Sequence, residues 1–204
     1  MSTRKYDQRL RAEAAEDTRR RILDAVYERL RAAPSEAVSV DRVAKIADVA
    51  RSTVYLIFGT RAGLFEALGM DLLQRGGVEH MLAAAADPDA REALRGTIQG
   101  CVSIYAAHRD VLRALSSMAV LDAEAVGGAI KKMEEGRAGG MAHLAQRLAT
   151  QEALRPDVTA DEAAHLLWLL TSFDSFDLLY TGRSLTADAV AGTLLTAAER
   201  GLCR

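Results

Sequence analysis

The chain has 204 residues, of which 50% are apolar and 26% charged, an ordinary composition for a protein with its own hydrophobic core. No apolar run reaches the roughly 18 residues that a membrane-spanning helix needs, and the charged residues 1–21 are unlike a secretory signal. The two cysteines, Cys101 and Cys203, match no metal-ligand spacing. We therefore expect a cytoplasmic protein that binds neither a membrane, nor a metal, nor an organic cofactor.

Positive charge is concentrated at the N-terminal end. Residues 1–61 contain 13 Lys and Arg against 9 Asp and Glu, whereas the other 143 residues contain 13 against 19. A basic head on an acidic body is typical of a protein that binds nucleic acid at one end. Many solvated protein faces carry a similar charge. The charge distribution alone therefore allows either a nucleic-acid-binding end or an ordinary solvated surface.

Helical patterns fill the chain, and no alternating strand pattern occurs. Residues 1–16 mix charged residues with alanine and are either a frayed helical extension or a disordered arm. A helix is expected to begin at Asp17-Thr18 and to end before Pro34, because proline cannot continue a helix. Its apolar side chains recur at helical spacing: Ile22, Leu23, Val26 and Leu30.

Two short helices with a tight turn between them follow. Ser39 is placed to cap a helix over Val40–Ala47, and Gly59 to end a second helix over Arg51–Phe58. Their small and apolar inner side chains let the two helices cross closely. This is typical of a helix-turn-helix unit, whose second helix enters the major groove of DNA. A helical hairpin buried in a larger bundle is the alternative that the pattern leaves open.

The start of the second short helix supplies the candidate DNA contacts. Arg51 can pair with a guanine edge or with a phosphate, and nearby hydroxyls suit phosphate oxygens. The first amides of the next helix favour an anion, and Arg61 adds positive charge beside them. The candidate DNA-binding residues are Ser39, Ala50, Arg51, Ser52, Thr53, Tyr55 and Arg61.

Further helical segments are expected after this unit. Thr60 can cap the first of them, and Thr159-Ala-Asp-Glu162 forms a capping box. Glycines interrupt the pattern between Ala123 and Ala153, so one kinked helix and two helices remain open there. The expected ranges are Arg61–Ala86, Pro88–Ala107, Asp110–Met118, Ala123–Ala153, 159–180 and 186–202. The predicted fold class is all-α.

Residues 18–68 resemble the N-terminal domain of the TetR family of transcriptional regulators. The resemblance rests, in order and spacing, on Arg21-Ile-Leu-Asp-Ala-Val-Tyr27, Ala37-Val-Ser-Val-Asp-Arg-Val-Ala44, Val49-Ala-Arg-Ser-Thr-Val-Tyr55, Phe58-Gly59 and Leu64-Phe65. It implies an extension over 1–16, a three-helix DNA-binding domain over 17–60 and a helical ligand-binding and dimerisation domain over 61–204. It also implies that Thr53, Tyr55 and Arg61 bind phosphates, while Arg51 and Ser52 face the groove.

The chain departs from the family pattern at several positions. Asp48 stands where the family usually has glycine in the turn, and Leu56-Ile57 stand where it usually has polar or aromatic residues. Aspartate can adopt the left-handed backbone conformation, at some cost. Two apolar residues remove contacts to the DNA backbone. The alternative function is therefore a helical ligand-binding or protein-interaction module with a degraded DNA-binding head.

The second half is expected to dimerise and to bind a small molecule. A palindromic operator needs two reading heads, so we expect a homodimer through the helices at 159–180 and 186–202, with a monomer as the alternative. Asp174 and Asp177, in the first of these helices, are expected to face water. The candidate pocket residues for an unidentified, weakly polar inducer are Tyr105, His108, Met118, Met133, His143, Trp168 and Phe173.

The predicted function is a repressor that binds a palindromic double-stranded operator and releases it when a small molecule occupies the helical domain. The ligand would favour one setting of the helix that follows Gly59-Thr60 and so change the spacing of the two heads. An enzyme is disfavoured because the four histidines form no close ligand pair, and because no phosphate-binding glycine loop or nucleophile elbow occurs. An activator remains open as an alternative to a repressor.

Overall fold

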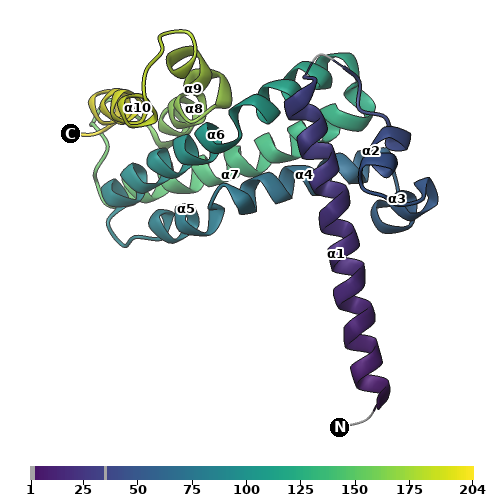
Figure 1. The fold of residues 1–204 in the computed structure, drawn as a ribbon. Helices are drawn as coiled ribbons and strands as arrows, with labels where there is room; N and C mark the ends of the chain where they lie inside the picture. The colour runs from purple at the N-terminus through teal and green to yellow at the C-terminus, as the bar shows by residue number, and fades with distance from the viewer. Residues whose placement is uncertain (1–2, 35) are drawn as a thin grey trace. The chain divides into compact units, whose positions relative to one another are not determined.

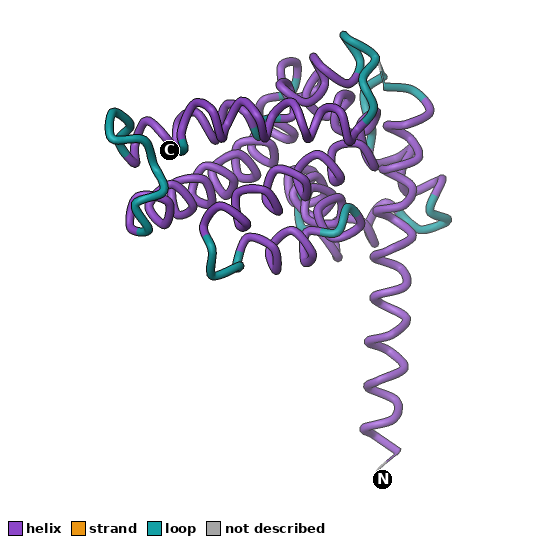
Figure 2. Tube along the Cα trace, turned by 90° about the vertical axis from the view of Figure 1, so that its left-hand side faces the viewer, coloured by secondary structure: helices purple, strands orange, loops and turns teal. Residues whose placement is uncertain are grey.

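The computed structural model describes residues 3–34 and 36–204, with side chains described from residue 8 onwards. Within these residues the chain is helical and holds no β-strand, apart from an isolated antiparallel bridge between Leu154 and Cys203 (Figure 2). The all-α fold class is therefore confirmed.

The N-terminal part of the chain forms α1 Thr3–Ala32, α2 Val40–Ile46, α3 Arg51–Phe58 and α4 Arg61–Arg75 (Figure 1). α1 begins earlier than predicted, at Thr3 instead of Asp17. Alanine, arginine and glutamate dominate residues 8–16, and these residues lose little side-chain freedom in a helix. The N-terminal extension is thus a continuation of α1 over the residues that the structure describes.

The predicted caps of the short helices are confirmed. The Ser39 hydroxyl accepts a hydrogen bond from the Arg42 backbone N–H at 3.2 Å. Gly59 ends α3 with a φ of 71°, a conformation that glycine adopts without steric penalty. The Thr60 hydroxyl accepts from the Gly63 N–H at 2.9 Å at the start of α4.

The rest of the chain forms α5 Val78–Ala85, α6 Ala90–Leu121, the π-helical turn η1 Ala123–Gly127, α7 Gly128–Thr150, α8 Ala160–Leu170, α9 Phe173–Tyr180 and α10 Ala187–Leu202. The capping box before α8 is confirmed, because Thr159 and Glu162 each accept the other's backbone N–H, at 3.2 and 2.8 Å. α10 buries its predicted apolar side against the core: Val190, Leu194, Ala198 and Leu202.

The prediction of one helix over Arg61–Ala86 is wrong, because α4 and α5 are separated at Gly76-Gly77. Gly77 has a φ of 86°, and a Cβ at Gly76 would lie 2.9 Å from the Ile104 side chain. α5 also packs closely on α6, where a Cβ on Gly100 would lie 2.4 Å from Met81. The Gly76-Gly77 pair is a local break signal that the hydrophobic period does not report.

The break expected after Ala107 is present within α6 as a kink at His108, where φ is −127° and ψ is 20°. The single helix expected over 159–180 is interrupted, because the Ser172 hydroxyl accepts from the Ser175 N–H at 3.0 Å and starts α9. Between residues 123 and 153 the structure has a π-helical turn followed by one helix, which continues through Gly136, Gly139 and Gly140.

The chain forms two compact units. The first contains residues up to 71 together with 113–130, and the second contains 72–112 together with 131–204. Large side chains are fully buried in each unit, for example Leu30 and Phe65 in the first and Leu167 and Phe176 in the second. The predicted domain boundary at residues 60 and 61 stays a prediction, since the first compact unit continues to Asp71 and includes the end of α6.

Candidate nucleic-acid interface

The turn between α2 and α3 has the geometry that a helix-turn-helix unit requires. The Val49 N–H donates to the Ala44 carbonyl at 3.0 Å, and Asp48 takes a φ of 53°. Asp48 therefore adopts the left-handed conformation expected of it. Val43 is fully buried, and Val54 is 2% exposed, so the inner sides of both helices are covered.

The outer side of α3 is exposed. Successive side chains of an α-helix are rotated by about 100°, which places Ser52 and Leu56 each about 160° from the buried Val54. These two residues point most directly away from the core; Ser52 is exposed and Leu56 is 86% exposed. Arg51 and Tyr55 lie on one flank of this outer side, and the half-buried Thr53 lies on the other.

Ser39 and Ala50 occupy the positions immediately before α2 and α3. The Ser39 hydroxyl serves as a helix cap, as described above. Alanine at position 50 cannot accept a hydrogen bond through its side chain, so the first amides of α3 receive no side-chain cap from it. Unsatisfied amides at a helix start are a position where a phosphate oxygen can bind.

Arg51 is held on its flank by a neighbour on α2. Its Nη1 lies 3.1 Å from both Asp41 carboxylate oxygens, and its guanidinium lies 5.6 Å from the centre of the Tyr55 ring. The hydrogen bond to the Tyr55 oxygen and the Asp41 charge both raise the pKa of Arg51. The side chain is still 58% exposed, so the guanidinium is oriented without being removed from solvent.

Arg61, which was predicted to bind a phosphate, is bonded to other groups of the protein in the structure. Its Nε and Nη2 donate to the Val38 carbonyl at 3.3 and 3.2 Å, and its Nη1 pairs with the Asp122 carboxylate. The guanidinium also lies 5.3 Å from the centre of the Phe65 ring. The Arg61 hydrogen bond and the Ala125 N–H lower the pKa of Asp122. A phosphate contact by Arg61 stays a prediction that would require these bonds to be exchanged.

Two of the candidate pocket residues come together in the second unit. The rings of Tyr105 and Phe173 are 5.7 Å apart in an edge-to-face arrangement, and both rings border Phe176. The Tyr105 hydroxyl donates to the Thr171 carbonyl at 2.9 Å. Burial raises the pKa of this hydroxyl far above its ordinary value. We call Tyr105, Phe173, Phe176 and Tyr180 the aromatic cluster.

The other candidate pocket residues are dispersed. His108 is buried at the kink of α6, Met133 is half-buried on α7, and Trp168 is 43% exposed on α8. Met118 is buried in the first compact unit, whereas the other six belong to the second. The predicted residues come from four helices, α6 to α9, and their common pocket stays a prediction.

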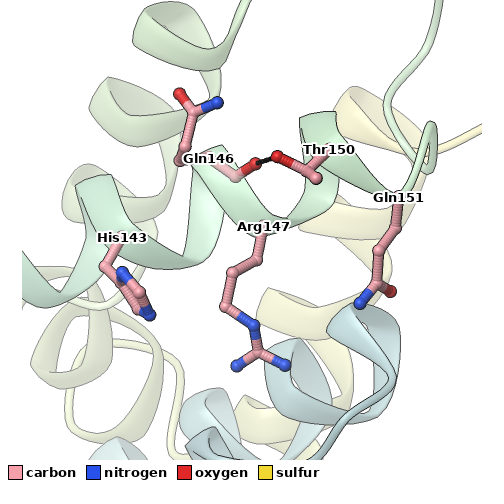
Figure 3. A pocket seen from close by; sticks show the side chains of 5 residues that line it. All are labelled: His143, Gln146, Arg147, Thr150 and Gln151. Carbon is pink, nitrogen blue, oxygen red and sulfur yellow. Dashed lines mark hydrogen bonds between the residues drawn. The ribbon is translucent and has the colours of Figure 1, made fainter.

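His143 faces a shallow hollow along the second half of α7 (Figure 3). Arg147 of α7 and Gln151, directly after this helix, extend toward the loop between α5 and α6. Arg147 donates to the Ala85 and Asp87 carbonyls, and Gln151 donates to the Pro88 carbonyl at 2.7 Å. The hollow measures about 140 Å³, which is less than small-molecule pockets usually offer. Its polar side chains anchor the loop.

Sequence reasoning missed two charged groups inside the second unit. Asp177 was expected to face water, but it is buried and accepts from Arg109 Nε at 2.7 Å and from the Thr181 hydroxyl at 2.6 Å. Arg137 of α7 donates to Thr171 Oγ1 at 3.0 Å and to the Trp168 carbonyl. Arg109 is distant in sequence from Asp177, as Trp168 and Thr171 are from Arg137, so no local pattern identifies these bonds. The exposed Asp174 agrees with its prediction.

Two other kinds of site were tested on the same structure. No helix in the described part of the chain is long and apolar enough to cross a membrane. Among residues 3–34 and 36–204, no three His, Cys, Asp or Glu side chains are grouped so that they could hold a metal ion.

Comparison with known proteins agrees with this geometry. Residues 22–68 match the family model described as bacterial regulatory proteins, tetR family. These residues run from α1 through the helix-turn-helix into α4, and they include the exposed outer side of α3. No curated protein matches the chain.

Solved structures share the fold over nearly the whole chain. NalD, the secondary repressor of the MexAB-OprM multidrug efflux pump in Pseudomonas aeruginosa, is 24% identical with a TM-score of 0.67, over 94% of this chain and 98% of NalD. A TetR-family regulator from Syntrophomonas wolfei is 13% identical with a TM-score of 0.73, over 90% and 94%. A transcriptional regulator from Saccharomonospora viridis, in complex with choline, is 16% identical with a TM-score of 0.69, over 93% and 99%.

Proposed function

Since residues 22–68 match the family model of the tetR family of bacterial regulatory proteins and the chain has the fold of solved regulators, we propose that this chain is a DNA-binding transcriptional repressor released by a small molecule. The single observation that supports it most is the exposed outer side of α3 within the matched module. A buried hairpin would cover that side, whereas a recognition helix must leave it open to the major groove.

The DNA contacts divide into two groups. Thr53, Tyr55 and the first amides of α3 are suited to phosphate oxygens, which position the helix. Arg51 and Ser52 are suited to base edges. Selection from random duplex DNA at a fixed salt concentration tests the proposal. We expect a palindrome whose half-sites lie about one helical turn apart; weak, salt-sensitive binding without any enriched sequence would reject it.

The homodimer is proposed to form through α8 and α10. Trp168 and Leu169 of α8 are 43% and 57% exposed, which is unusual for such large side chains. The exposed side of α10 carries small residues, among them Gly192, where an added Cβ meets no described atom within 4 Å. Small side chains allow a partner helix to approach closely, as in a four-helix interface.

Gly192 offers a selective test of the dimer. Gly192→Arg should leave the folded protomer intact, because the site is open, but should place a charge in the proposed interface. Sedimentation should then report a monomer, with helicity unchanged by circular dichroism. Gly139→Arg is the matched control, since Gly139 on α7 is equally open. If the Gly192→Arg variant still forms a dimer, the interface does not include this side of α10.

The inducer is proposed to bind beside the aromatic cluster, along α6. The Thr97 side chain is buried, and none of the described residues hydrogen-bonds to its Oγ1. Thr97, Cys101 and Tyr105 follow one another at spacings of four residues, so they lie along one side of α6. A buried hydroxyl without a partner is costly, and a ligand with one polar group and an apolar body would satisfy it.

A thermal-shift screen of small molecules tests this pocket, and it should include choline because one structural neighbour was solved with it. A ligand that uses Thr97 should stabilise the wild type and lose most of that stabilisation in Thr97→Val. Equal stabilisation of both proteins would place the pocket away from Thr97.

Release of DNA is proposed to depend on two helices, α4 and α6, that each have residues in both compact units. α4 begins in the first unit and ends in the second, whereas α6 begins in the second and ends in the first. Within the first unit, Arg61 at the start of α4 is bound to Asp122, directly after α6. A ligand that favours one position of α6 would therefore also favour one position of α4 and of the attached α3. The size of this shift is limited by the difference between the ligand's affinities for the two positions.

A further inference from the structure

Leu56 stands out on the outer side of α3, because an apolar side chain is 86% exposed at the centre of a surface that should be polar. Ser52 lies one turn before it, on the same side of the helix. No neighbouring helix covers this side in the described chain. An exposed leucine contributes little to the core of the protomer, and this one is open to contact with a partner.

We infer that Leu56 reads the operator by packing against the C5-methyl group of a thymine in the major groove. The inference rests on the proposed function, because it takes DNA as the partner of α3. Ser52 and Leu56 are the two residues of α3 that point most directly away from buried Val54, and the base edges lie ahead of a recognition helix in that direction.

The polar side chains beside Leu56 do not occupy the centre of the outer side of α3. Arg51 and Tyr55 lie to one side, and Asp41 draws the Arg51 guanidinium toward α2. The leucine side chain can neither donate nor accept a hydrogen bond. Among the base edges in the major groove, the thymine methyl is the apolar feature it can recognise. Leu56 therefore selects for thymine at one position of each half-site.

The test begins with selection of random duplex DNA by the wild type. Each thymine of the enriched half-site is then replaced by deoxyuridine, which removes only the methyl group. Binding is measured for the wild type, for Leu56→Ala and for Leu82→Ala. Leu82 is an exposed leucine of α5, outside the matched module, and serves as the control. Circular dichroism checks that each variant retains its helicity.

We expect one thymine at which deoxyuridine weakens wild-type binding by about fourfold, the equivalent of one buried methyl group. The same substitution should leave Leu56→Ala unaffected, and Leu82→Ala should behave like the wild type. If every deoxyuridine operator weakens wild type and Leu56→Ala equally, Leu56 does not read a methyl group while DNA binding stands. If the wild type enriches no sequence, the proposed function falls and the inference falls with it.

Discussion

The helix-turn-helix and the second unit place their polar groups in opposite ways. On α3 the side chains of Arg51, Ser52 and Tyr55 are exposed, and Arg51 is bonded to Asp41 and Tyr55. In the second unit, Asp177 and Thr171 are buried and bonded to Arg109, Tyr105 and Arg137. The exposed set suits a large anion that binds from outside, whereas the buried set suits rigid packing around a small molecule. Mutations should therefore cost stability in the second unit and DNA affinity in the first.

The largest effect on stability is expected for Asp177→Ala. The substitution removes a buried carboxylate and takes its main partner from Arg109, which is partly exposed and keeps Asp110. It should lower the free energy of unfolding by about 3 kcal/mol, the lower end for a broken buried pair. Urea denaturation measures this loss. Asp174→Ala changes an exposed residue of the same helix, and it should shift the unfolding midpoint little. Equal losses for both variants would contradict the contrast between buried and exposed carboxylates.

Gly100→Ala should destabilise the second unit by about 2 kcal/mol, because the new methyl group overpacks the contact between α5 and α6. The added Cβ would lie 2.4 Å from Met81 Cγ. Gly139→Ala is the matched control in an open part of α7, where alanine should stabilise the helix by up to about 1 kcal/mol. Thermal unfolding of the two variants should move in opposite directions; a shared direction would refute the close packing of α5.

Asp122→Asn should lower the stability of the first unit by about 1 kcal/mol near neutral pH, since a partly exposed ion pair contributes no more than this. The pKa of Asp122 is lowered by Arg61 in the folded state. The stabilisation is therefore fully present above the carboxyl's ordinary pKa, and it is lost as the pH falls through the lowered folded value. The difference between wild type and variant should vanish in strong acid. A difference that grows on acidification would contradict the Arg61 contact.

The smallest effect is expected for Asp41→Asn. Both Arg51 and Asp41 are exposed, so folding stability should not change measurably. The Arg51 guanidinium would lose its orientation, and the preference for guanine at its operator position should weaken. Competition between guanine-containing and substituted operators measures this preference. An unchanged preference would show that Asp41 does not position Arg51.

Features that depend on neighbouring residues could be predicted from the sequence, whereas features that depend on distant residues could not. Signals within a few residues were sufficient for Ser39, Gly59 and Thr159, because caps act on the helix beside them. The module at 18–68 was recognisable for the same reason. Bonds such as Arg61 to Asp122 depend on residues far apart in the chain, and no local spacing reports them. The burial of Asp177 likewise follows from packing between helices, whereas the break at Gly76-Gly77 had a local signal in the glycine pair.

The exposed side of α3 is proposed to bind operator DNA. The most direct measurement compares operator affinity, at one fixed salt concentration, of the wild type and of the double variant Arg51→Ala, Tyr55→Phe. Both side chains are exposed, so the variant should fold normally. We predict that its affinity for the selected operator falls at least about fivefold, the lower end of what a lost base contact costs. Equal affinity of the two proteins would contradict the account and favour a module whose DNA-binding head no longer functions.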